Sequence, residues 1–260
     1  MLHHEISGNG KKPLVLLHGF MENTTIWNEM EAHLSKDFTL IKIDLPGHGK
    51  SKVYQEIHTV ELMAEKVKEV IDALKLEKIN LLGHSLGGYV SLAFAEKFPE
   101  ILESMTLFFS TTVADDEEKK AIRKRSIAVI DENFETFVKT SIPNLFSNNE
   151  KDILEGKIEL AKNIAKSTNK EGVKAAQLGM AERPDRTEIL ENLDAKILII
   201  AGKYDNAVKT ENLLKIIPEK TNIKTYVLDC GHKKKKKKPT ICAEIINTEL
   251  FHNLPKHFLL

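Results

Sequence analysis

Residues 79–89 read Ile79-Asn80-Leu81-Leu82-Gly83-His84-Ser85-Leu86-Gly87-Gly88-Tyr89. A short apolar run ends at Gly83, and residues 91–97 continue as an alanine-containing segment typical of a helix. A Gly-x-Ser-x-Gly turn between a strand and a helix forces its serine into a strained backbone conformation. The glycines on either side let neighbouring elements approach without a Cβ clash. Ser85 is therefore the candidate nucleophile, at the start of a helix whose N–H groups favour negative charge.

Two upstream motifs give this pattern its context, because Gly-x-Ser-x-Gly alone also occurs by chance. The apolar run at 13–17 leads into His18-Gly19-Phe20, and the run at 38–43 leads into Asp44-Leu45-Pro46-Gly47-His48-Gly49-Lys50-Ser51. With these motifs in this order, the chain resembles the α/β-hydrolase superfamily, in its branch of small, single-domain serine esterases. The resemblance is specific over about the first hundred residues and weaker over the C-terminal third.

The resemblance implies a fold and a class of chemistry. The fold is α/β: a mostly parallel twisted sheet flanked by helices, with an inserted helical cap. A serine hydroxyl needs a base, and the base needs an orienting acid. In this fold they follow the serine in the order acid, then histidine. The expected strand at 195–202 is followed by Asp205, and the expected strand at 223–228 is followed by His232. The predicted catalytic residues are Ser85, Asp205 and His232.

Other residues could in principle fill these roles. Asp229 is near His232 in sequence, but at the same strand end it is expected to point away, so Asp205 is preferred. By resemblance, His18, His48 and His84 shape loops and do not act as the base. The other histidines lie in segments with no family motif (His3, His4, His33, His58, His252 and His257).

An oxyanion hole needs two backbone N–H groups directed at the charged oxygen of the intermediate. One belongs to the residue after the nucleophile, which is Leu86. The other comes from the loop after the first long strand, which makes it the amide of Phe20. Phe20 also suits a plain hydrophobic wall of the pocket, and its amide and ring can serve separately.

Composition is that of an ordinary soluble globular protein. The 260 residues are 42% hydrophobic and 29% charged, with a formal net charge of zero. No apolar run is long enough to span a membrane, and the N-terminus lacks a signal-peptide core. With two cysteines, a disulfide framework is not expected and the cytoplasm is the expected compartment. This chemistry requires no metal or organic cofactor, and no nucleic-acid partner is expected.

Alternating strand and helix patterns predict a parallel sheet covered on both faces. An N-terminal hairpin-like segment precedes them, and no strand-like run appears between about 112 and 194. We therefore expect a core of 1–111 and 191–260 with a helical cap at 112–190. Apolar cap residues are expected to roof the active site and set substrate choice, or simply to pack on the core (Phe134, Phe137, Val138, Leu145, Phe146, Leu178 and Met180).

Six consecutive lysines, Lys233–Lys238, follow His232 and depart from the family pattern. They account for six of the 38 basic residues. Such a run could contact nucleic acid or an anionic membrane. A solvated loop is the preferred interpretation, since the rest of the chain shows no basic pattern.

The predicted function is hydrolysis of a small carboxylic ester through an acyl-enzyme on Ser85. The same three residues would also suit a carbon–carbon bond hydrolase, a thioesterase, an amidase or a perhydrolase. A non-catalytic ligand-binding protein on this fold is the alternative from another class. The sequence does not indicate the substrate or the oligomeric state.

Overall fold

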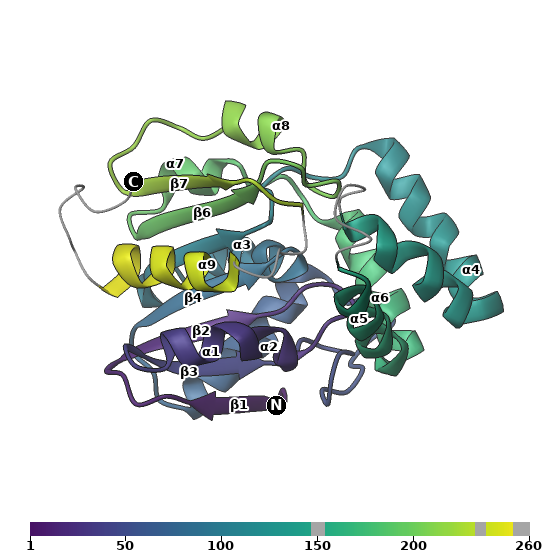
Figure 1. Ribbon diagram of the computed structural model, residues 1–260, viewed down its shortest axis with the longest axis horizontal. Coiled ribbons are helices and arrows are strands. Elements are labelled where there is room, and N and C mark those ends of the chain that lie inside the picture. The colour runs from purple at the N-terminus through teal and green to yellow at the C-terminus, as the bar shows by residue number, and fades with distance from the viewer. Residues whose placement is uncertain (147–153, 232–237, 252–260) are drawn as a thin grey trace.

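A seven-stranded sheet runs through the middle of the molecule in the computed structural model (Figure 1). The structure describes residues 1–146, 154–231 and 238–251. The strand order is β1-β3-β2-β4-β5-β6-β7; β1 is antiparallel to its neighbour and all other pairs are parallel. The prediction of a mostly parallel sheet is confirmed. The strands are β1 (His4–Ser7), β2 (Lys12–Leu17), β3 (Phe38–Ile43), β4 (Ile79–His84), β5 (Leu102–Phe108), β6 (Lys196–Gly202) and β7 (Ile223–Leu228).

The N-terminal hairpin expected from the sequence is wrong. β1 pairs with β3, with His4 opposite Ile43, and not with the next strand in the chain. The physical reason is that β2 has β3 on one side and β4 on the other, so it offers no free edge. β1 therefore forms the edge of the sheet.

Helices cover both faces of the sheet, as the alternating pattern predicts. α1 and α9 pack on one face, with Trp27 and Phe108 among the buried residues. α2, α3 and α7 pack on the other. The helices are α1 (Asn28–Leu34), α2 (Val60–Ala73), α3 (Leu86–Lys97), α4 (Glu117–Ser141), α5 (Glu155–Ser167), α6 (Lys170–Glu182), α7 (Glu188–Asn192), α8 (Thr210–Lys215) and α9 (Lys238–Ile246). Shorter turns are the 3-10 helices η1 (Thr24–Trp27), η2 (Pro99–Ile101) and η3 (Ile142–Leu145), and a π-helical turn η5 (Asn247–Phe251).

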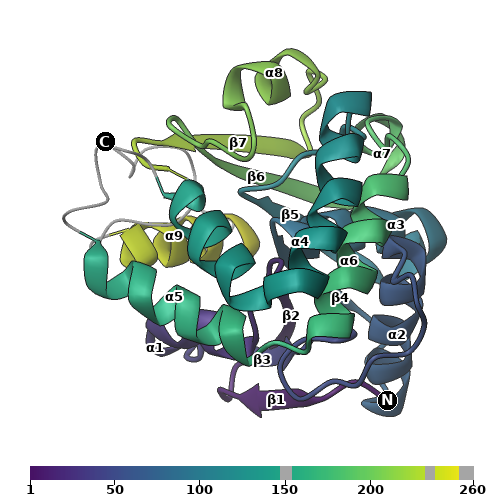
Figure 2. The same ribbon diagram turned by 90° about the vertical axis from the view of Figure 1, so that its right-hand side faces the viewer.

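Helices α4, α5 and α6 come between β5 and β6 and gather at one end of the sheet (Figures 1 and 2). An apolar cluster lies among them and includes Phe137, Ile142 and Val173, together with Met21 from the loop after β2. α4 is interrupted at Asn133, whose φ of −155° is extended. The Asn133 side chain accepts a hydrogen bond from the N–H of Thr136, as an N-cap does. α4 is therefore two helical segments separated by a break at Asn133.

Residues 147–153, 232–237 and 252–260 lie outside the described residues. They include His232 and most of the lysine run. Within the described part of the chain, no helix is both long enough and apolar enough to cross a membrane.

Candidate active site

Ser85 occupies the tight turn between β4 and α3. Its φ of 50° and ψ of −110° lie in a region that residues with a side chain rarely adopt. The turn is held by the Ser85 N–H, which donates to the Phe108 carbonyl at 3.0 Å. The Ser85 carbonyl in turn accepts from the hydroxyl of Ser110 at 2.8 Å. Backbone strain of this kind persists only where its surroundings enforce it, and it is typical of active sites.

Glycines beside Ser85 are required by close packing. A Cβ on Gly83 would lie 2.1 Å from the carbonyl oxygen of Gly87. A Cβ on Gly87 would lie 2.3 Å from the carbonyl oxygen of Leu17, at the end of β2. The turn therefore lies directly against the end of the neighbouring strand. β2 and β4 are also the strands between which the chain changes direction along the sheet, where ligands bind in open α/β folds.

The loop after β2 is positioned by His18. Its Nε2 accepts from the N–H of Leu45 at 2.9 Å, and its Nδ1 lies 2.7 Å from the carbonyl of Gly19. The first contact makes Nε2 an acceptor, so Nδ1 carries the proton of a neutral ring. Burial lowers the pKa of His18, which agrees with this neutral form. Phe20 follows in the same loop, and Leu86 is the first residue of α3, so its N–H has no acceptor within the helix.

Asp205 lies in the turn after β6 and is 8% exposed. One carboxylate oxygen accepts from the N–H groups of Ala207 and Val208, both at 2.8 Å. The N–H of Tyr204 donates to the carbonyl of Cys230 at 2.9 Å, so this turn lies beside the segment that leads to His232. The rival acid, Asp229, is exposed at the end of β7.

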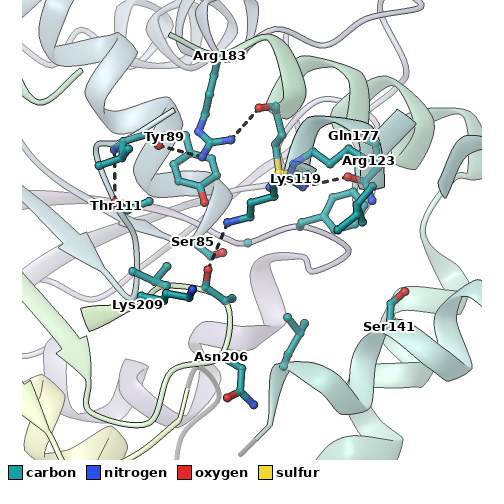
Figure 3. A pocket seen from close by; sticks show the side chains of 18 of the residues that line it. Ser85, Tyr89, Thr111, Lys119, Arg123, Ser141, Gln177, Arg183, Asn206 and Lys209 are labelled. Atoms are coloured by element: carbon teal, nitrogen blue, oxygen red, sulfur yellow. Dashed lines mark hydrogen bonds between the residues drawn. The ribbon is translucent and has the colours of Figure 1, made fainter. Parts of the chain in front are cut away.

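A cavity of about 610 Å³ borders Ser85 (Figure 3). Phe20 also lines this cavity, whereas Leu86 is fully buried and His232 lies outside the described residues. The cavity walls come from the loops after β2, β5 and β6, and from α4 and α6. Of the apolar residues expected to roof the site, three line the cavity (Phe137, Leu145 and Met180), while Val138 and Phe146 are buried in the cluster between the helices.

A charged cluster beside the cavity had no signal in the sequence. Asp115, whose side chain is fully buried, is paired with Arg123, Arg183 and Lys119. Arg123 also donates to the side chain of Gln177 at 3.0 Å. Burial would raise the pKa of Asp115, but hydrogen bonds from Arg183 and Arg123 outweigh it and lower the pKa to about 2. The three cations line the cavity: Lys119 and Arg123 come from α4, and Arg183 directly follows α6, about 60 residues further along the chain.

Comparison with known families and proteins agrees with the geometry. The family described as "alpha/beta hydrolase fold" matches residues 12–234 of this chain. A thermophilic esterase from Thermogutta terrifontis, solved with malate bound, is 32% identical with a TM-score of 0.89. That alignment covers 96% of this chain and 92% of the esterase.

Two curated relatives show the range of similarity. A 2-hydroxy-6-oxononadienedioate/2-hydroxy-6-oxononatrienedioate hydrolase of Escherichia coli (strain K12) is 26% identical over 247 residues, covering 89% of this chain and 84% of the enzyme. An uncharacterised protein of Mycobacterium tuberculosis is 35% identical over 111 residues, 43% of this chain. The chain spans about a third (32%) of that relative's length.

Proposed function

Because this chain belongs to the α/β-hydrolase family of enzymes, we propose that it is a serine hydrolase that cleaves a small carboxylic ester. One observation carries the proposal: Ser85, strained at the start of α3, borders a cavity of about 610 Å³. A serine held in this way presents its hydroxyl to a bound carbonyl, as a nucleophile must. Helices α4–α6, in residues 112–190, act as the cap over a core of 1–111 and 191–260.

In the proposed mechanism His232 takes the proton of Ser85 as the serine oxygen attacks the ester carbonyl. Asp205 orients the imidazole and stabilises its charged form. Its burial and two backbone hydrogen bonds favour it over the exposed Asp229. The amides of Phe20 and Leu86 stabilise the oxyanion. The alcohol then leaves with the proton from His232, and water releases the acid from Ser85.

A second candidate is a carbon–carbon bond hydrolase acting on a carboxylate substrate with the same three residues. The observation that favours it is the cluster of Lys119, Arg123 and Arg183 in the cavity wall, where three cations share the single carboxylate of Asp115. The Escherichia coli relative is named for dioate substrates. Asp116 and Glu118 also border the cavity, however, so the wall is not cationic throughout.

Hydrolysis of p-nitrophenyl esters from acetyl to hexanoyl tests the proposal. Ser85→Ala and His232→Ala should each lose activity by roughly three orders of magnitude or more. Asp205→Asn should lose most activity, and Asp229→Asn is the matched control that should retain it. Unchanged activity in Ser85→Ala would contradict the nucleophile. An inert wild type that binds ligands tightly would instead favour the non-catalytic alternative.

A further inference from the structure

Glu22 is a buried carboxylate beside the candidate nucleophile. It lies in the loop after β2, is 4% exposed and borders the cavity. Its Oε2 atom accepts a hydrogen bond from the N–H of Gly19 at 2.8 Å. The same oxygen lies 2.8 Å from Nδ1 of His84, and because a carboxylate only accepts, Nδ1 donates.

The two donors belong to the two halves of the proposed catalytic centre. Gly19 directly precedes Phe20, whose amide is one proposed oxyanion donor. His84 directly precedes Ser85. One carboxylate oxygen thus connects a loop after β2 with the turn after β4. We propose that Glu22 is a positioning residue that holds the Phe20 amide in place relative to Ser85, an inference that rests on the proposed function.

The packing around this contact leaves little freedom. A Cβ on Gly19 would lie 2.7 Å from Oε2 of Glu22 and 2.8 Å from Nδ1 of His84, so a larger residue would displace the pair. Hydrogen bonds to an ionised acceptor are shorter and stronger than neutral ones. A buried carboxylate is also costly unless it is hydrogen-bonded. Glu22 therefore resists any movement that separates the loop after β2 from the turn that carries Ser85. A displacement of about 1 Å at a catalytic centre can lower the rate a hundredfold.

A matched control exists in Asp44. This carboxylate is 2% exposed and accepts from the N–H groups of Thr24 and Lys50, each at 2.9 Å. It also contacts the ring of His3 at 2.8 Å. Asp44 thus resembles Glu22 in burial and in its partners, but it does not line the cavity. If Glu22 had a purely structural role, replacing Glu22 and replacing Asp44 should change stability and turnover per active site in the same way.

The experiment compares full-length wild type with Glu22→Gln, Glu22→Ala and Asp44→Asn. Active sites are counted by labelling Ser85 with a fluorophosphonate, and kcat per labelled site and KM are measured with p-nitrophenyl butyrate. Glu22→Gln should lower kcat about tenfold, and Glu22→Ala about a hundredfold or more, the scale of a lost oxyanion donor. KM should change less than about threefold in both, because the amide acts on the transition state. Affinity for a boronic acid, which mimics the tetrahedral intermediate, should fall in parallel with kcat/KM.

Asp44→Asn should lower the melting temperature while kcat per labelled site stays within about threefold of wild type. Wild-type kcat per site in Glu22→Ala would overturn the positioning role and leave the proposed function standing. So would an equal loss of kcat per site in Asp44→Asn and Glu22→Ala. A wild type that neither turns over the esters nor labels at Ser85 would contradict the proposed function, and the role of Glu22 with it.

Discussion

The guanidinium of Arg183 lies over the ring of Tyr89, with its central carbon 3.9 Å from the ring centre (Figure 3). Arg183 directly follows α6, and Tyr89 lies in α3, four residues after Ser85. A cation over an aromatic ring is stabilised by the ring's negative face. The same guanidinium donates to Asp115 at 2.9 Å. The end of α6 is therefore attached to the helix that begins at the candidate nucleophile.

Asp115→Asn should destabilise the protein at neutral pH, because Arg123 and Arg183 would keep buried charges without a carboxylate. Loss of one partner of a buried pair costs about 3 kcal/mol or more. The pKa of Asp115 is lowered to about 2 in the fold, so its contribution is complete above the unfolded-state value near 4 and is lost as the pH falls toward 2. Urea unfolding at pH 7 and pH 3 should show a smaller penalty at pH 3. An equal loss of unfolding free energy at both pH values would contradict the stabilising role of ionised Asp115. Glu117 forms an exposed pair with Lys120, so Glu117→Gln is the control, and its unfolding free energy should change little.

Replacing Ser85 by glycine should relieve the strain that alanine keeps. A φ of 50° is unfavourable for any residue with a Cβ and accessible to glycine. Ser85→Gly should therefore be more stable than Ser85→Ala by about 1 kcal/mol, after the larger chain entropy of unfolded glycine is included. Thermal unfolding of both variants measures the difference. If Ser85→Ala proves the more stable, the turn stores no such strain.

Gly179→Ala should disturb the contact between α6 and the segment before α2. A Cβ at this position would lie 1.8 Å from the carbonyl oxygen of His58, so the helix must shift. Overpacking of this kind costs about 1–3 kcal/mol. Gly156→Ala, in α5, is the matched control, because its Cβ would meet nothing within 4 Å. This control should be neutral or slightly stabilising, and equal unfolding temperatures for the two variants would refute the packing argument.

The charge of the acyl group should distinguish the two candidate functions. An ester hydrolase for neutral substrates should prefer p-nitrophenyl butyrate over the mono-p-nitrophenyl ester of succinic acid. An enzyme for carboxylate substrates should prefer the succinate ester. In that case Arg123→Gln should raise KM for the succinate ester about tenfold, as expected for a lost charged hydrogen bond. A neutral preference that Arg123→Gln leaves unchanged would argue against the carboxylate-directed alternative. Release of p-nitrophenol, followed by absorbance, measures the rate with either ester.

The sheet and the nucleophile turn could be predicted from the sequence because they depend on local signals. Apolar runs ending in glycine marked β2, β4 and β6, and Gly-x-Ser-x-Gly at a strand–helix junction marked Ser85. The N-terminal strand was assigned to the wrong partner, since pairing depends on which sheet edge is free. The roles of Asp205, Phe20 and Leu86 remain predictions, as does that of His232, which lies outside the described residues.

By itself, the sequence determined which segments form strands and helices and where the strained serine lies, because periodicity and glycine spacing act between near neighbours. Only the tertiary structure decided that Glu22 connects Gly19 with His84. It also decided that Asp115 forms salt bridges with Arg123 and Arg183 beside the cavity. Neither carboxylate is part of a catalytic motif, although Glu22 lies two residues after His18-Gly19-Phe20. Their charge is stabilised by partners up to 68 residues away, which become neighbours only when the sheet and the helices between β5 and β6 have formed.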